Sequence, residues 1–162
     1  IRLPGGIVVG AIVVVNSLGD VVEPDTGRIL AGARDPGTGR FIDTRRFLME
    51  NGGLNDAVTG NTTIGVIATN ARLNKEQANK IASMAHDGLA LAIRPVHTML
   101  DGDTLFTLAT GKIEADVNVI GTAAVEAVAR AVVNAVNFCP PRRFSAAFCG
   151  KKRNLIDFWT LL

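Results

Sequence analysis

The chain has 162 residues, of which 48% are hydrophobic and 20% are charged. This composition is typical of one globular domain with a sizeable core, and it excludes a disordered chain. The formal charge of +2 is unevenly divided: residues 1–136 carry 12 Lys and Arg against 14 Asp and Glu, whereas residues 137–162 carry five against one. Because residues 1–136 have no basic patch, we expect no nucleic-acid partner.

Neither a membrane segment nor a secretion signal is expected. The apolar run from Gly5 to Val15 is too short to cross a bilayer, and it has no charged leader and no cleavage site. Cys139 and Cys149 fit neither a disulfide framework nor a zinc-ligand spacing. We therefore expect a reducing, cytoplasmic setting. Because the chain begins at Ile1 and enters an apolar strand almost at once, we also expect it to be part of a longer polypeptide.

The first 61 residues predict one long strand followed by mostly irregular chain. The continuous Ile, Val and Ala run over Gly6–Asn16 predicts a strand that is buried on both faces. Asp20–Glu23 could form a short return strand, and the Gly- and Pro-rich residues 24–40 predict a surface loop. Thr44–Glu50 predicts a short helix capped by the preceding aspartate. Residues 51–61 predict a loop exposed enough for a chain break.

The second half predicts two strands that alternate with two long helices. Thr62–Thr69 is rich in β-branched residues and predicts a strand, and Thr104–Thr110 predicts another. A helix is expected from Asn74, which begins a capping-box-like sequence, until Pro95 stops it. A second helix is expected over Glu114–Val136, where alanines and valines form one stripe. This order predicts an α/β fold with helices packed on a sheet.

The step from Asn61 to Thr62 places a hydroxyl residue at the first position of a strand. If the bond between them were cut, Thr62 would carry a free α-amino group beside its hydroxyl, so one residue could supply nucleophile and base. An α-amine has a reference pKa of about 7.7–8.0, against about 10.4 for lysine, and suits general-base work near neutral pH. Two other interpretations stay open: an ordinary strand residue, or a glycosylation sequon over Asn61-Thr62-Thr63.

Three further polar residues are candidates for the same chemistry. Asp101 and Asp103 flank Gly102 directly before a strand, and residues i and i+2 of an extended segment point the same way. The two carboxylates could raise each other's pKa, bind an ammonium group or hold a cation, although Asp-Gly-Asp is also a turn sequence. Asn16 ends the first strand, and its amide could donate to a developing oxyanion or simply close the strand.

The two histidines match no known spacing. His86 and His97 form neither a metal-ligand motif nor part of a triad with a nucleophile elbow. We expect one of them to lie on a helix face and the other to be structural or to line a pocket.

Four separated segments occur in the order found in a known family. They are NTTIGVIATN at 61–70, MAHDGLA at 84–90, IRPVHT at 93–98 and DGDT at 101–104. Together with the upstream Leu3–Asn16, they resemble the DmpA-type self-processing peptidases of family S58, and the resemblance covers residues 3–136. Within that family, Thr62 and the Asp-Gly-Asp pair are most similar to the nylon-oligomer hydrolases.

The resemblance implies a layered α/β/β/α sandwich, of which this chain has only the C-terminal part. It implies cleavage between Asn61 and Thr62, so that residues 1–61 end an α subunit and residues 62–136 form a β subunit. The two pieces are expected to stay associated and to assemble as a homo-oligomer of heterodimers, with neither a metal nor an organic cofactor. A lysine that the nylon hydrolases place in the active site belongs to an upstream part absent here, and residues 137–162 form a tail without a match.

The resemblance also implies roles for the candidate residues. Thr62 would be the nucleophile, Asn16 its hydrogen-bond or oxyanion partner, and Asp101 and Asp103 the acidic groups that orient the site. The expected reaction is hydrolysis of linear 6-aminohexanoate oligomers. Alternatives are an aminopeptidase acting on short peptides or aminoacyl amides and esters, and a non-catalytic binding domain of the same fold.

Overall fold

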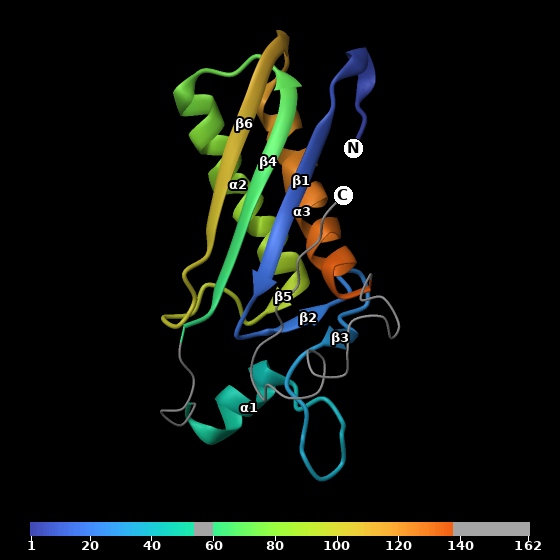
Figure 1. Cartoon of the computed structure of the whole chain (residues 1–162), viewed down its shortest axis with the longest axis vertical. Coiled ribbons are helices and arrows are strands. Elements are labelled where there is room, and N and C mark those ends of the chain that lie inside the picture. The colour runs from blue at the N-terminus through green and yellow to red at the C-terminus, as the bar shows by residue number, and fades with distance from the viewer. Residues whose placement is uncertain (54–59, 138–162) are drawn as a thin grey trace, which may run out of the picture.

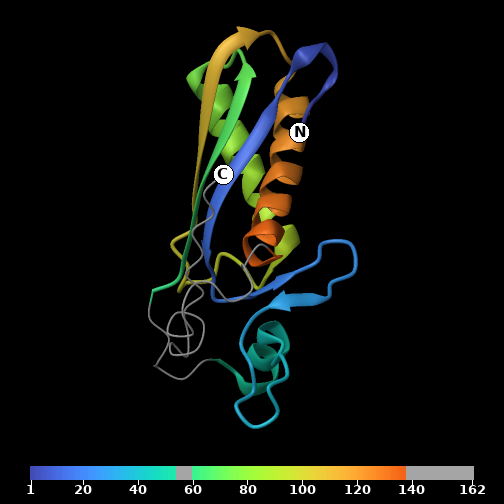
Figure 2. The ribbon, with the colours of Figure 1, turned by 45° about the vertical axis from the view of Figure 1, so that its right-hand side comes forward.

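The structure is a computed structural model that describes residues 1–53 and 60–137. Its main sheet has the strand order β1-β4-β6, formed by Val9–Asn16, Thr62–Ala71 and Thr104–Ile113. Helices α2 (Lys75–Ala92) and α3 (Val117–Asn137) lie together against one face of this sheet (Figures 1 and 2). The described residues thus form a helix layer on a sheet layer, which confirms the α/β class and corresponds to part of the expected sandwich.

Strand β4 is central because it pairs with both of its neighbours. It runs antiparallel to β1 and parallel to β6. A parallel pair needs a crossover connection, and helix α2 supplies it between β4 and β6. The core between sheet and helices is made of small aliphatic side chains, among them Val9, Val13, Val15, Ile67, Ile81, Ala85, Leu89, Leu105, Ile120, Ala124, Val128 and Val132.

The opposite face of the sheet is apolar and uncovered by the described residues. Ile12 pairs with Val66, and Val66 pairs with Phe106 on the next strand; these side chains are 50%, 41% and 57% exposed. The prediction that the first strand, over Gly6–Asn16, is buried on both faces is therefore wrong at Ile12, because the helices cover only one face. An apolar row across three strands is the kind of surface that packs against a second sheet.

A second, smaller sheet lies at one end of the molecule (Figure 1). Its order is β3-β2-β5, formed by Ile29–Ala31, Asp20–Val22 and Ile93–Arg94. The predicted return strand exists but does not return along β1, and the predicted loop over residues 24–40 contains β3. The chain that enters β2 instead lies close to the residues after β5. A Cβ on Gly19 would lie 1.9 Å from the carbonyl oxygen of Pro95, so only a glycine fits there.

Capping residues decide where the helices begin. The capping box of α2 is confirmed, because Asn74 accepts a hydrogen bond from the N–H of Gln77 and the Gln77 side chain accepts one from Asn74. Asp43 caps α1 (Thr44–Asn51) as predicted. Helix α3 begins at Val117 rather than at Glu114, because the Asp116 carboxylate accepts the N–H groups of the first turn. The strands β4 and β6 extend two and three residues beyond their predicted ends.

Helix α3 is long and rich in apolar residues. Its 21 residues include an 18-residue window with a mean hydropathy of 1.6, which is long and apolar enough to cross a membrane by length and composition alone. Half of this window is buried in the structure, where the helix packs against α2 and β1. A helix in the core of a folded domain can be equally long and apolar, and the packing of α3 explains its apolar side chains. The predicted tail from residue 137 overlaps the end of this helix, and the rest of the tail lies outside the described residues.

Two glycines let α2 and α3 pack closely. A Cβ on Gly88 would lie 2.4 Å from the carbonyl oxygen of Val125 and 2.9 Å from Cβ of Val128. From the other helix, a Cβ on Gly121 would lie 2.4 Å from the thioether of Met84. Because Gly88 faces backbone, which cannot rotate away, we regard it as the stricter position.

A first prediction concerns this helix contact. Gly88→Ala should lower the free energy of unfolding by about 1–3 kcal/mol, because the helices must separate to accept the methyl group. Urea denaturation of the two proteins measures the change. Gly10→Ala is the matched control, since a Cβ there meets nothing within 4 Å. A Gly88→Ala protein as stable as the control would contradict the close packing.

A buried carboxylate ties α1 to the smaller sheet. Asp20 is 1% exposed, and it accepts hydrogen bonds from the N–H and the hydroxyl of Thr44 at 2.7 and 2.9 Å. A Cβ on Gly32 would lie 1.9 Å from its carboxylate, so a glycine is needed beside it. Burial raises the pKa of Asp20, and the hydrogen bonds from Thr44 lower it less.

The second prediction follows from that raised pKa. Because the folded pKa lies above the unfolded value, the contribution of Asp20 to stability is present at low pH and declines as pH rises through the folded pKa. Asp20→Asn, which cannot ionise, should therefore lose less stability than the wild type from about pH 4 upward. Urea denaturation at a series of pH values tests this. A steeper decline in the variant would show that the sign is wrong.

Candidate active site

The peptide between Asn61 and Thr62 is clamped to the segment that precedes β6. The Asn61 N–H donates to the carbonyl of Leu100 at 3.0 Å, and the Asn61 carbonyl accepts from the N–H of Gly102 at 2.8 Å. These bonds form a parallel bridge between Asn61 and Asp101, one residue before β4 begins. Gly60 has a φ of 62°, a left-handed turn that leads the chain into this bridge.

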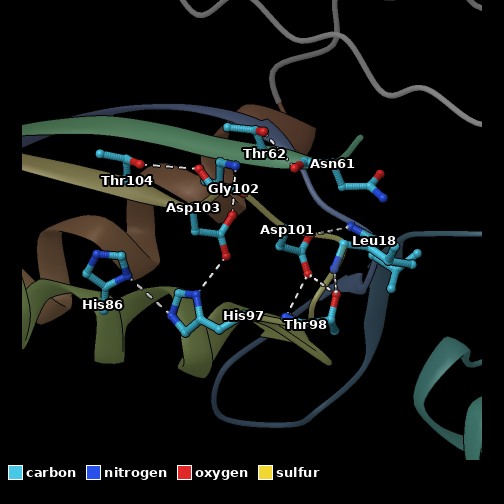
Figure 3. Close-up of polar contacts among 12 residues, drawn as sticks. Leu18, Asn61, Thr62, His86, His97, Thr98, Asp101, Gly102, Asp103 and Thr104 are labelled. Atoms are coloured by element: carbon cyan, nitrogen blue, oxygen red, sulfur yellow. Dashed lines mark hydrogen bonds and ion pairs between the residues drawn. The ribbon is translucent and has the colours of Figure 1, made fainter. Parts of the chain in front are cut away.

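Two donors meet on the carbonyl oxygen of Asn61. Besides the Gly102 N–H, the Thr62 hydroxyl donates to it at 2.6 Å (Figure 3). A Cβ at Gly102 would lie 3.0 Å from the Thr62 hydroxyl oxygen, so a glycine leaves room for the hydroxyl. Hydrogen bonds to a carbonyl oxygen stabilise the negative charge that it gains when its carbon is attacked.

The two aspartates of the Asp-Gly-Asp segment have different partners. Asp103 accepts from the N–H of Thr63 at 2.8 Å through one oxygen, and its other oxygen lies 2.7 Å from Nδ1 of His97. Asp101 accepts from the N–H of Leu18 at 3.2 Å, and from the N–H and hydroxyl of Thr98 at 3.0 and 2.6 Å. Asp103 thus holds the start of β4, whereas Asp101 fixes the turn that supplies Gly102 and joins it to the end of β1.

Asn16 lies beside Thr62 at the same end of the sheet. The two residues are Cα partners in the antiparallel pairing of β1 with β4. The Asn16 amide makes one long contact of 3.5 Å, to the carbonyl of Gly60. In this uncut chain the Asn61 carbonyl therefore takes its backbone hydrogen bond from Gly102, and the Asn16 amide faces the neighbouring peptide.

The structure joins both histidines to this cluster, which the sequence analysis missed. Nδ1 of His86, on α2, lies 3.3 Å from Nε2 of His97, whose other nitrogen contacts Asp103 (Figure 3). Burial, and secondarily His97, lower the pKa of His86. No ligand or triad spacing could have revealed this contact. The sequence did show that His97 lies in the short link between α2 and the Asp-Gly-Asp segment, close to the other candidate residues. Among residues 1–53 and 60–137, no group of three or more His, Cys, Asp or Glu side chains is placed to hold a metal ion.

Comparisons with known proteins identify a family that this chain resembles over most of its length. A model of peptidase family S58 matches residues 2–141. An uncharacterized aminopeptidase of Mycobacterium leprae is 39% identical over 93% of this chain and 46% of its own length. An uncharacterized aminopeptidase of Mycobacterium tuberculosis is 39% identical over 83% of this chain and 45% of its own length.

A further relative has a more specific name. A 6-aminohexanoate-oligomer endohydrolase of Paenarthrobacter ureafaciens is 34% identical over 70% of this chain and 32% of its own length. The chain spans half the length or less of these curated relatives. The family model matches most of the chain, and the chain therefore belongs to peptidase family S58.

Proposed function

We propose that this chain carries the cleavage point and the nucleophile of a self-processing amide hydrolase. The observation that carries the proposal is the Asn61–Thr62 peptide, whose carbonyl oxygen is bonded by the Gly102 N–H and by the Thr62 hydroxyl. The names of the relatives support amide hydrolysis, since aminopeptidases and oligomer endohydrolases both break amide bonds.

Self-cleavage would proceed by a shift of the acyl group from nitrogen to oxygen. The Thr62 hydroxyl oxygen attacks the carbonyl carbon of Asn61, and the Gly102 N–H stabilises the negative oxygen that results. The C–N bond then breaks, and the Thr62 nitrogen takes up the proton that the hydroxyl has lost. Water hydrolyses the ester, which leaves a carboxylate on Asn61 and restores the hydroxyl beside a free amine on Thr62.

The two pieces have a reason to stay together after such a cut. β1 belongs to residues 1–61 and β4 to residues 62–136, and the two strands pair over eight residues from Val9–Asn16 to Thr62–Thr69. This pairing and the shared core do not depend on the Asn61–Thr62 bond. We propose on this basis an α piece and a β piece that remain one folded unit.

Turnover would use the freed amine. An α-amine with a reference pKa of about 7.7–8.0 can take the hydroxyl proton of Thr62 near neutral pH while the oxygen attacks a substrate amide. The acyl-enzyme is then released by water. Asn16, the strand partner of Thr62, would donate to the substrate oxyanion, and Asp101 and Asp103 would hold the surrounding backbone.

Two substrate classes are in competition. Linear 6-aminohexanoate oligomers are the substrates in the name of one relative, and we propose them first. An aminopeptidase is the second candidate, favoured by mycobacterial relatives that cover more of the chain at higher identity. Parallel assays of 6-aminohexanoate oligomers and aminoacyl amides, with the complete natural polypeptide, distinguish them by which amide is hydrolysed.

The third prediction tests the nucleophile and separates a catalyst from a binding domain. Thr62→Ala should remain one uncut chain and lose essentially all amide hydrolysis, because it has no hydroxyl to attack with. Intact-mass analysis reads the cut and product chromatography reads the turnover. Thr62→Ser keeps the hydroxyl and should still be cut. Wild-type material that is active while its Asn61–Thr62 bond is whole would refute the proposed function.

The fourth prediction concerns the carbonyl clamp. Gly102→Ala should slow self-cleavage about tenfold or more, because its Cβ would lie 3.0 Å from the Thr62 hydroxyl oxygen and push it out of place. A time course of precursor and product by mass spectrometry measures the rate. Gly10→Ala, on the open sheet face, should cleave like the wild type. Equal rates in the two variants would show that the hydroxyl position beside Gly102 has no effect.

A further inference from the structure

The His86–His97–Asp103 chain reaches from helix α2 to the start of β4. His97 has a φ of 56°, a left-handed backbone that is uncommon for a residue with a side chain. Figure 3 shows its ring between the ring of His86 and the carboxylate of Asp103. The contacts are 3.3 Å and 2.7 Å, so both ring nitrogens of His97 are engaged. An uncommon backbone conformation is kept only where its surroundings require it, and here it directs the His97 ring between His86 and Asp103.

Asp103 passes this contact on to the cleavage region. Its side chain is 2% exposed, so its two oxygens depend on protein partners. One oxygen faces Nδ1 of His97, and the other accepts the N–H of Thr63, the residue after Thr62. A buried carboxylate that lost the histidine would be left with one partner and a large desolvation cost.

We propose that His97, backed by His86, is a positioning residue that keeps the Asp103 carboxylate bonded to the Thr63 N–H, and thereby fixes Thr62 for attack. The inference rests on the proposed function, and it assigns to the histidines a role that the nucleophile, the amine and the oxyanion donors do not fill. Neither histidine has a hydrogen bond to Thr62 in the described structure, and the link to the cleavage point runs through Asp103.

The number of protons on His86 and His97 decides whether the hydrogen bonds from His86 through His97 to Asp103 can all form. Nδ1 of His97 must carry a proton to donate to Asp103. The contact between Nε2 of His97 and Nδ1 of His86 then needs one proton between the two nitrogens. The pair can therefore gain one proton over its neutral state and keep both contacts. A second added proton would place N–H groups on both facing nitrogens and break the contact.

The surroundings of His86 also disfavour the second added proton on the two histidines. Burial and the charge of His97 lower the pKa of His86, while Asp103 and Asp87 act in the opposite direction. The net direction disfavours the doubly protonated pair, so the contact survives to a lower pH than two free histidines would allow. Below that point, Asp103 should lose its alignment and self-cleavage should slow.

The fifth prediction uses self-cleavage, because the precursor has no free amine at Thr62 to add its own titration. Precursor of the complete natural polypeptide, made by cell-free synthesis, is followed by intact mass from about pH 4.5 to pH 9. His97→Ala should slow cleavage about tenfold or more at every pH, because Asp103 loses its partner. His97→Asn should recover most of the rate near neutral pH, since Asn tolerates a left-handed backbone and its amide can donate to Asp103.

The pH profile separates positioning from simple packing. His97→Asn and His86→Gln cannot take up the second proton, so both should lose the decline on the acidic side that the wild type shows. His97→Ala cleaving at the wild-type rate, or His97→Asn as slow as His97→Ala with an unchanged acidic decline, would overturn the inference. A wild-type precursor that is never cut at Asn61–Thr62 would instead refute the proposed function.

Discussion

The candidate site depends on one pairing, in which the segment entering β4 lies parallel to the segment entering β6. That pairing puts the Gly102 N–H on the carbonyl oxygen of Asn61 and the Asp103 carboxylate on the N–H of Thr63. A parallel pair requires a helix to carry the chain back. Helix α2 does so, and its close contact with α3 at Gly88 sets how tightly the crossover packs on the sheet.

The polar groups of the site fall into two sets, those that hold the neighbouring backbone and those that contact the Asn61–Thr62 peptide. Asp101 holds the turn and the end of β1, and Asp103 holds the beginning of β4 and receives the histidine pair. The groups that hydrogen-bond the Asn61 backbone directly are the Thr62 hydroxyl and the backbone of Leu100 and Gly102. Each carboxylate accepts hydrogen bonds from backbone N–H groups, which fixes the backbone on both sides of the Asn61–Thr62 step.

Among the described residues, helices cover one face of the sheet that supports the site, and the other face is uncovered. Ile12, Val66 and Phe106 form an apolar row on the face that α2 and α3 do not cover. The chain also spans half the length or less of its curated relatives. A second sheet packed on that row would complete the sandwich that the family resemblance implies, and it would bury this apolar surface.

Local patterns in the sequence were sufficient for the elements that depend on near neighbours. The capping box at Asn74, the cap at Asp43 and the strand beginning at Thr62 were all predicted, because each is decided within a few residues. The family resemblance was confirmed by the family match, whereas the roles it implies for Thr62 and the Asp-Gly-Asp pair stay predictions. Only the tertiary structure showed that β2 pairs with β5, that one sheet face is open, and that His86 reaches His97. Those features arise from contacts between distant segments, which no local spacing in the sequence records.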